Sequence, residues 1–399
     1  MDFDLSHEQR AIRELARDFA RREVAPAAAD LDERCAFPYD LVARMGSLGL
    51  FALPFPESVG GAGGEFLSYC LVLEELARAD ASIAITLEAA VSLGIAPLVS
   101  FGTDDQRERW LPPLLRGERL WAFGLTEPGA GSDAGAIQTR ARRDGDEWVI
   151  TGRKAFITNA GTDVSAGVTI TAATGTDPST GEPLTTCIAV ERGTPGYVPG
   201  PPLRKLGWHA SDTRDLAFDG CRVPVANTVG VEGAGLRQFL STLESGRVAI
   251  AALSVGLAQA CLDACLGYAV ERIAFGQPLA RFQATQFKLA DMATQIELSR
   301  TMTWRAATEI DRRGRAGVLA SMAKLHASET ATACASQAVQ IHGGAGFMED
   351  LPVARYYRDC KVNEIGEGTS EVQRILIARH MLDEHGVAVG AGTRRPAPG

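Results

Sequence analysis

The chain has 399 residues, of which 46% are hydrophobic and 22% are charged, so it has the composition of an ordinary globular protein with room for two or three domains. Its net charge of −9 argues against nucleic acid as a partner. No apolar run approaches a membrane span, and residues 1–9 lack the character of a signal or transit peptide, so we expect a cytoplasmic protein with no membrane partner. The eight cysteines include no CxxC pair and the six histidines no HxxxH pair, so no metal site is expected.

Residues 1–120 are expected to form an N-terminal α-helical domain. Apolar residues recur near the 3.6-residue spacing of a helix in 9–24, 39–48 and 66–79, and 104–115 is a further short helix.

Residues 121–233 change character and are expected to form a middle β domain of short strands. Helical periodicity is largely absent, glycines interrupt the region, and short apolar runs such as 148–151 and 187–190 are typical of strands. Within this region, 129–134 matches the dinucleotide-binding pattern G-x-G-x-x-A. No crossover helix follows the match, so it does not indicate a Rossmann fold.

Residues 234–385 return to helical spacing, in the four segments 235–274, 283–313, 318–341 and 370–382. The first is about forty residues long and would span on the order of 60 Å. Together they predict a bundle of long helices, and therefore an α+β fold that is mainly α. The tail, 386–399, is rich in Gly, Pro and Ala and is expected to be disordered.

One carboxylate, Glu367, lies between Gly366 and Gly368 in a loop that joins two helical stretches. The glycines would let the backbone approach a ligand closely, so Glu367 could extend into a cavity. Locally, however, the segment also fits a helix start at which Thr369 or Ser370 caps and Glu367 is solvated. The loop alone leaves both interpretations open.

Three segments resemble the acyl-CoA dehydrogenase family, in its order and near its spacing: LTEPGAGSD at 125–133, QIHGGAGF at 340–347, and YRD followed by EGT at 357–369. The resemblance covers nearly the whole chain. It implies an N-terminal helical domain, a middle β domain and a C-terminal four-helix bundle. It also implies FAD-dependent α,β-dehydrogenation of an acyl-CoA thioester to the trans-2-enoyl-CoA.

The resemblance also assigns candidate binding residues. Gln340, Gly343 and Gly344 match contacts that a neighbouring subunit makes in the family, which implies a homotetramer. Phe156 stands where the family more often has Trp, and it alternates with Thr158 on one face of an expected strand. Arg272 has the forked guanidinium that suits a pyrophosphate, although a helix C-terminus also favours arginine. The implied FAD contacts are Phe123, Leu125, Thr126, Ser132, Phe156, Thr158, Arg272, Phe275, Phe282, Gln283, Gln340, Gly343, Gly344, Thr369 and Glu371. The implied substrate contacts are Ser132, Glu244, Arg247 and Gly368.

For catalysis, the resemblance makes Glu367 the base that removes the α proton, while the β hydrogen leaves as hydride to flavin N5. A flavin ribityl hydroxyl and the backbone N–H at Glu367 would hold the thioester carbonyl. Some family members have their base immediately before the residue that matches Arg247, where this chain has Gly246. Electrons would then pass to an electron-transfer flavoprotein.

The sequence is also compatible with three other functions. The acyl group could be attached to a carrier protein in place of coenzyme A. A flavin-dependent monooxygenase of the same fold, or a non-catalytic flavin- or acyl-binding subunit, would be expected to lack Glu367 and its loop. The acyl chain itself is not determined, although 87–96 is expected to form the pocket floor. Gly366, where many straight-chain relatives have Tyr, would leave room for a branched or cyclic group.

Overall fold

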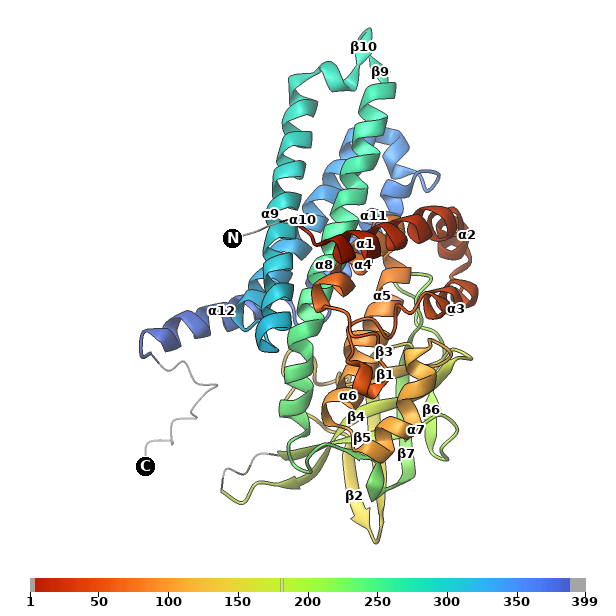
Figure 1. The fold of residues 1–399 in the computed structure, drawn as a ribbon, viewed down its shortest axis with the longest axis vertical. Coiled ribbons are helices and arrows are strands. Elements are labelled where there is room, and N and C mark those ends of the chain that lie inside the picture. The colour runs from red at the N-terminus through yellow and green to blue at the C-terminus, as the bar shows by residue number, and fades with distance from the viewer. Residues whose placement is uncertain (1–3, 180, 182, 388–399) are drawn as a thin grey trace.

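A bundle of long helices lies on a β domain, and a second group of helices packs against both in the computed structural model (Figure 1). The structure describes residues 4–179, 181 and 183–387. The part of the expected disordered tail from 388 onward lies outside these residues.

The N-terminal third is helical, as the sequence predicts. Two of its helices begin with capping boxes, in which Ser6 pairs with Gln9 and Thr103 pairs with Gln106. Apolar spacing did not identify α2 or the stretch 81–101, because the latter is buried on all sides and has no single apolar stripe. The helical segments are α1 (His7–Phe19), η1 (Ala20–Val24), α2 (Ala25–Arg34), α3 (Tyr39–Ser47), η2 (Glu57–Val59), α4 (Phe66–Ala79), α5 (Ala81–Glu88), η3 (Ala89–Ile95), α6 (Ala96–Phe101) and α7 (Asp104–Leu115).

The expectation that no apolar run approaches a membrane span needs correction. Two helical segments, Ala81–Phe101 and Gly235–Glu271, are long and apolar enough to cross a membrane. In each, 83% of the most apolar window is buried inside the protein. Both are therefore typical of core helices in a large fold.

The middle region forms an eight-stranded sheet in the order β6-β7-β3-β2-β4-β5-β8, with β1 added in parallel beside β4. Strands β3, β4 and β7 each have 12 residues, so the strands are longer than the short runs of the sequence indicated. The pairing of β3 with β7 shifts register between Lys154 and Ile157, which places a bulge at Phe156. The strands are β1 (Leu120–Gly124), β2 (Arg140–Asp144), β3 (Glu147–Thr158), β4 (Ser165–Thr176), β5 (Pro183–Glu191), β6 (Tyr197–Pro199), β7 (Thr213–Pro224) and β8 (Thr228–Val229), with the short helix η4 (Val225–Asn227) before β8.

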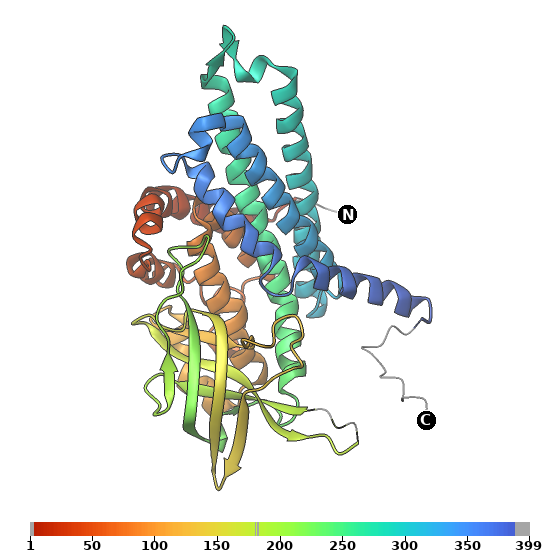
Figure 2. The same ribbon diagram turned by 180° about the vertical axis from the view of Figure 1, so that it is seen from behind.

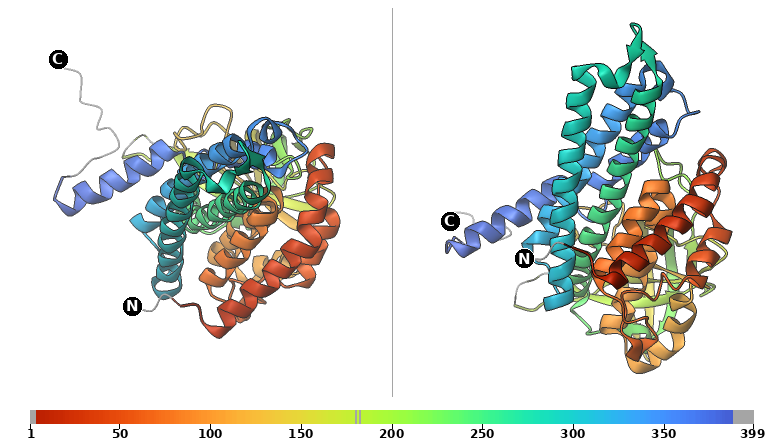
Figure 3. Two further views of the ribbon diagram at one scale, coloured as in Figure 1. Left: turned by 90° about the horizontal axis from the view of Figure 1, so that it is seen from above. Right: turned by 45° about the horizontal axis from the view of Figure 1, so that its top comes forward.

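The C-terminal helices pack side by side around α8, the longest element of the chain (Figure 2). A small ribbon, β9 with β10, follows α8 and forms the far tip of the bundle. The last helix, α12, contacts α10 and then projects away from the body (Figure 3). The segments are α8 (Gly235–Glu271), β9 (Ile273–Ala274), β10 (Gln277–Pro278), η5 (Leu279–Arg281), α9 (Gln283–Arg313), α10 (Val318–His342), η6 (Gly343–Phe347), α11 (Pro352–Cys360), η7 (Lys361–Glu364) and α12 (Ser370–Glu384).

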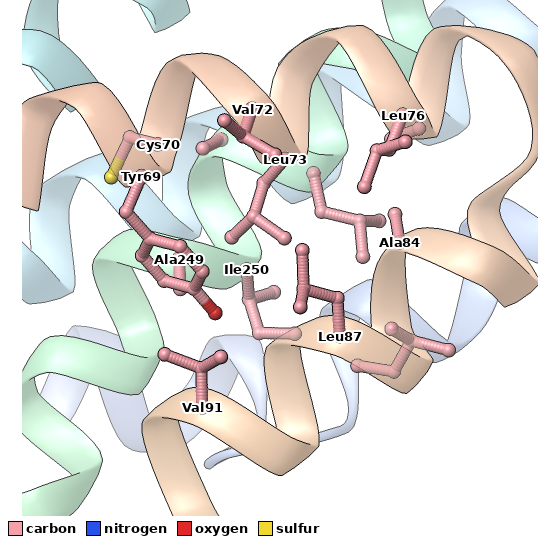
Figure 4. Packing of buried hydrophobic residues seen from close by; sticks show 14 of the residues in the cluster. Tyr69, Cys70, Val72, Leu73, Leu76, Ala84, Leu87, Val91, Ala249 and Ile250 are labelled. Atoms are coloured by element: carbon pink, nitrogen blue, oxygen red, sulfur yellow. The ribbon is translucent and has the colours of Figure 1, made fainter. Parts of the chain in front are cut away.

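The two helical groups share one hydrophobic core, in which α4, α5 and η3 pack against α8. Leu73, Leu87, Val91 and Ile250 meet at this junction and are all almost completely buried (Figure 4). The junction fixes α5, which ends at Glu88, against α8.

Leu73→Ala is expected to lower the free energy of unfolding by about 2–5 kcal/mol, because it leaves a cavity in this closely packed junction. Leu206→Ala is the matched control, since Leu206 is 66% exposed and its truncation should change stability by at most about 0.5 kcal/mol. Denaturant unfolding followed by circular dichroism measures both. Equal stability of the two variants would contradict the packing described.

Candidate active site

Glu367 lies in the loop between η7 and α12 with its backbone in the left-handed region, at φ +55°. Gly368 follows at φ +96°. A non-glycine residue at such an angle costs of the order of 1–3 kcal/mol, and strain of this kind gathers at functional sites. The side chain points inward: Oε2 of Glu367 is fully buried and has no hydrogen-bond partner of good geometry among the described residues.

The loop is fixed from two helices. Lys324 on α10 is fully buried, and its Nζ donates to the carbonyl oxygen of Gly368 at 2.8 Å. Gln373 on α12 donates to the same oxygen at 2.9 Å. Thr369 caps α12 through its hydroxyl, which accepts from the N–H of Val372 at 3.3 Å. Thr369 therefore caps the helix, as one interpretation of the sequence predicted, and Glu367 points into the protein, as the other predicted.

Buried charges surround the Glu367 carboxyl. Burial raises the pKa of Glu367 to about 7, although Lys324 and Arg247 act to lower it. Burial lowers the pKa of Lys324 to about 8. Burial also lowers the pKa of Arg247 on α8, and the Glu367 carboxylate acts to raise both values. The site therefore contains a carboxyl that titrates near neutral pH beside two cations, which is the arrangement that a general base requires.

A second carboxyl, that of Glu88 at the end of α5, lies next to the Glu367 carboxyl. Its side chain is fully buried, and neither of its oxygens has a hydrogen-bond partner of good geometry. Burial raises the pKa of Glu88 well above its ordinary value, and the nearby Glu367 carboxylate raises it further. Motif matching did not identify Glu88. The available signal was its isolation, because it is the one charged residue between Asp80 and Asp104.

Three other acids near the loop have different surroundings. Glu364 pairs with Lys361 at 2.6 Å. Glu371 is exposed in the first turn of α12. Oε1 of Glu244 accepts from the N–H groups of Ala316 and Gly317, at 2.6 Å each, and so holds the turn that precedes α10. This bonding argues against the substrate contact that the resemblance implied for Glu244.

The 125–133 segment is tied to β3 by a buried ion pair. Nζ of Lys154 donates to Oε1 of Glu127 at 2.7 Å and to the carbonyl of Leu125 at 3.2 Å. The N–H of Ala155 donates to the carbonyl of Thr126 at 2.9 Å. Burial favours the neutral form of Glu127, but Lys154 outweighs it and holds the pKa of Glu127 below its ordinary value. The pair therefore fixes Leu125 and Thr126 beside β3.

The other candidate flavin contacts of this region lie near that segment. Phe156 occupies the bulge of β3 at φ +60° with 68% of its surface exposed, so the regular alternation expected between Phe156 and Thr158 is interrupted. Phe123 on β1 stacks on Phe239 of α8, with ring centroids 3.9 Å apart. Ser132 is exposed. An exposed ring on a strained bulge is unusual for the fold alone, and it fits a planar partner.

A second set of candidate contacts lies at the far tip of the bundle. Arg272, Gly343 and Gly344 line a cavity of about 360 Å³ together with Tyr268 and His342, whose rings stack 4.2 Å apart. The exposed guanidinium and the bare glycine backbone suit a phosphate group. The remaining members of the set are Phe275, which is 97% exposed, Phe282, which meets it edge-on at 6.3 Å, and the exposed Gln283 and Gln340.

The two sets are far apart on one chain. Arg247, which lies near Glu367, and Arg272, which directly follows the last residue of α8, are 25 residues apart, or about 37 Å along the helix. The contacts at the tip are therefore far from Glu367 on a single chain.

The family models that match this chain describe three consecutive domains. The N-terminal domain of acyl-CoA dehydrogenase matches residues 6–118, its middle domain matches 122–221, and its C-terminal domain matches 233–382.

Two known proteins are similar over nearly the whole chain. The probable acyl-CoA dehydrogenase YngJ of Bacillus subtilis (strain 168) is 48% identical over 382 residues, which is 96% of this chain and 100% of that protein. The mitochondrial short-chain specific acyl-CoA dehydrogenase of Rattus norvegicus is 44% identical over 379 residues, which is 95% of this chain and 91% of that protein.

Two solved structures are also similar. Butyryl-CoA dehydrogenase from Megasphaera elsdenii superposes with a TM-score of 0.92 at 41% identity, over 96% of this chain and 100% of that one. A chain from a structure described as an electron transferring flavoprotein of Acidaminococcus fermentans superposes with a TM-score of 0.92 at 40% identity, over the same shares.

Proposed function

This chain belongs to the acyl-CoA dehydrogenase family of FAD-dependent oxidoreductases, and we propose that Glu367 is the base that removes the α proton of the acyl thioester. The observation that supports this proposal most strongly is the buried Oε2 of Glu367, a carboxyl oxygen with no protein partner. The other acids of the loop are exposed or already paired. Proton abstraction breaks the Cα–H bond, and the proton moves to the Glu367 carboxylate.

The thioester carbonyl must be held while negative charge develops on it. Within the described residues, the backbone N–H of Glu367 donates to no protein group. The left-handed turn at 367–368 leaves this N–H beside the carboxyl of the same residue. We propose it as one donor to the thioester oxygen, with Arg247 supplying positive charge nearby.

The residues present suit FAD in two places. Phe123, Leu125, Thr126, Ser132, Phe156, Thr158 and the loop residues Thr369 and Glu371 are proposed to hold the flavin end. Arg272, Phe275, Phe282, Gln283, Gln340, Gly343 and Gly344 are proposed to hold the diphosphate and adenosine end. When bound, the flavin supplies the hydride acceptor for the β hydrogen.

The separation of these two sets supports an oligomer, and we propose a homotetramer. One chain would supply the flavin set and a neighbouring chain the adenosine set of each FAD. The projecting α12 agrees with this arrangement, because it exposes Ile375, Met381 and Leu382 and its end lies beside no other described helix or strand.

A short acyl chain is the proposed substrate, because several close relatives are named short-chain specific or butyryl-CoA dehydrogenases. A side chain at Gly366 would meet only one atom, the carbonyl oxygen of Val362, at 3.5 Å, so this chain leaves space there that could admit a branched group. Coenzyme A is proposed as the acyl carrier. Parallel assays with acyl-CoA and acyl-carrier-protein thioesters separate the two carriers.

An electron-transfer flavoprotein is the proposed electron acceptor, and the cytoplasm the proposed location. A relative from a structure described as an electron transferring flavoprotein superposes on this chain, which supports the first proposal. The eight cysteines are all free, which fits a reducing compartment and supports the second.

Glu367→Gln is expected to lower the rate of flavin reduction by butyryl-CoA at least about 10²–10⁴-fold, because it keeps the shape of the side chain and removes the base. Anaerobic stopped-flow absorbance measures this rate, and FAD content and ligand binding should persist. Glu364→Gln is the matched control and should reduce its flavin at nearly the wild-type rate. The assignment is wrong if Glu364→Gln loses the activity and Glu367→Gln keeps it.

Gly246→Ala is expected to slow flavin reduction, because a Cβ at Gly246 would lie 2.0 Å from Oε2 of Glu367 and displace the carboxyl. The matched control is Gly267→Ala on the same helix, where a Cβ meets no atom within 4 Å. Alanine favours a helix interior by roughly 0.5–1 kcal/mol, so the control should be slightly stabilised and fully active. Wild-type rates in both variants would contradict the described position of Glu367.

Arg272→Ala is expected to weaken FAD binding roughly ten- to hundredfold, the effect of losing one charge-assisted contact to phosphate. Isothermal titration of the apoprotein with FAD measures it. Arg312→Ala serves as the control, because it removes an exposed arginine at the C-terminal end of α9, away from the tip. Unchanged affinity in Arg272→Ala would mean that this residue only complements the end of α8.

A further inference from the structure

The carboxyl of Glu88 has no structural role that accounts for its burial. It is the last residue of α5, it is 0% exposed, and both of its oxygens lack a partner of good geometry. The Glu367 carboxyl lies within hydrogen-bonding reach of Glu88, and its Oε2 is likewise buried and without a partner of good geometry among the described residues. Two unpartnered carboxyls that face each other can each be satisfied if one of them keeps its proton and donates it to the other.

We propose that Glu88 is a positioning residue of the dehydrogenation, whose neutral carboxyl donates a hydrogen bond to the Glu367 carboxylate and holds it ready to accept the α proton. This inference rests on the proposed role of Glu367 as the base.

The charges around the pair decide which carboxyl keeps the proton. Arg247 on α8 and Lys324 on α10 are on the Glu367 side and lower the pKa of Glu367. Among the residues that the structure describes, no cation contributes to the environment of Glu88, where Ser92 of η3 is a hydroxyl neighbour. The remaining titratable neighbours are Tyr69 and Cys70 of α4, both buried, with pKa values raised by burial, so both stay neutral.

The same environment gives the direction of the effect. A hydrogen bond from neutral Glu88 lowers the pKa of Glu367, against the larger effect of burial. The pair holds two protons below about pH 7 and one proton above it, and this last proton is on Glu88. Without the donor, Glu367 would become a carboxylate only at higher pH.

The first test is the pH dependence of flavin reduction in the FAD-loaded enzyme with butyryl-CoA. Glu88→Leu removes the donor and should move the apparent pKa of the rate upward by about one unit or more. At pH 7 the rate should fall about fivefold or more and recover as pH rises. Glu88→Gln keeps an N–H donor and should restore most of the wild-type profile. Thr86→Val replaces another buried polar side chain of the same helix by an apolar one of similar shape, and it should keep the wild-type profile.

The second test does not depend on turnover or on the leucine variant. Infrared spectra of the wild type at pH 8 should contain the carbonyl band of a protonated carboxyl that is absent from Glu88→Gln. Identical spectra in this region would overturn the proposal, because Glu88 would then not hold the proton. This test also decides the matter if Glu88→Leu does not fold.

The outcomes distinguish a failure of Glu367 as the base from a failure of Glu88 as its positioning residue. If Glu367→Gln retains fast flavin reduction, the proposed base is wrong and the positioning role of Glu88 is wrong with it. If Glu367→Gln is inactive while Glu88→Leu keeps the wild-type rate and pH profile, only the positioning role is overturned. A shifted profile in Glu88→Leu, rescued in Glu88→Gln, supports both.

Discussion

The site depends on the burial of one carboxyl group. A base that is effective in an acyl pocket must be shielded from water, and an uncompensated buried charge is very costly. Glu367 satisfies this constraint through its strained backbone at φ +55°, which points the side chain into the protein. The strain is tolerated because Lys324 and Gln373 both hold the next carbonyl, that of Gly368.

The groups that balance this charge come from distant parts of the chain. Glu88 ends α5, Arg247 is on α8 and Lys324 is on α10, and these three helices contribute to one hydrophobic core. The apolar junction shown in Figure 4 therefore has a catalytic consequence, because it fixes α5, which ends at Glu88, against α8, which bears Arg247. Glycine at 246 completes the arrangement by leaving the volume that the carboxyl occupies.

Sequence reasoning found the elements whose signals are local. Helices with one apolar stripe were predicted, whereas the stretch 81–101 was missed because burial on every side removes the stripe. Glu367 was found because its glycine neighbours and its motif lie beside it. Glu88 and Lys324 were missed because their roles depend on contacts across more than 40 residues of sequence. The bulge at Phe156 could not be predicted from the sequence either, because it arises from a register shift between two strands.

The charges of the site also act on the stability of the fold. The pKa of Glu367 is raised from 4.5 to about 7, so the folded chain binds more protons than the unfolded chain in this range, and its contribution to stability falls as pH rises from 4.5 to 7. The pKa of Lys324 is lowered from 10.5 to about 8, so the unfolded chain binds more protons there, and its contribution rises from pH 8 to 10.5. Between these two windows both groups are charged, and their combined contribution to stability is lowest. This interval is also the one in which Glu367 is a carboxylate with its ammonium partner in place, so the conditions that favour proton abstraction are those under which the buried site is most costly to the fold.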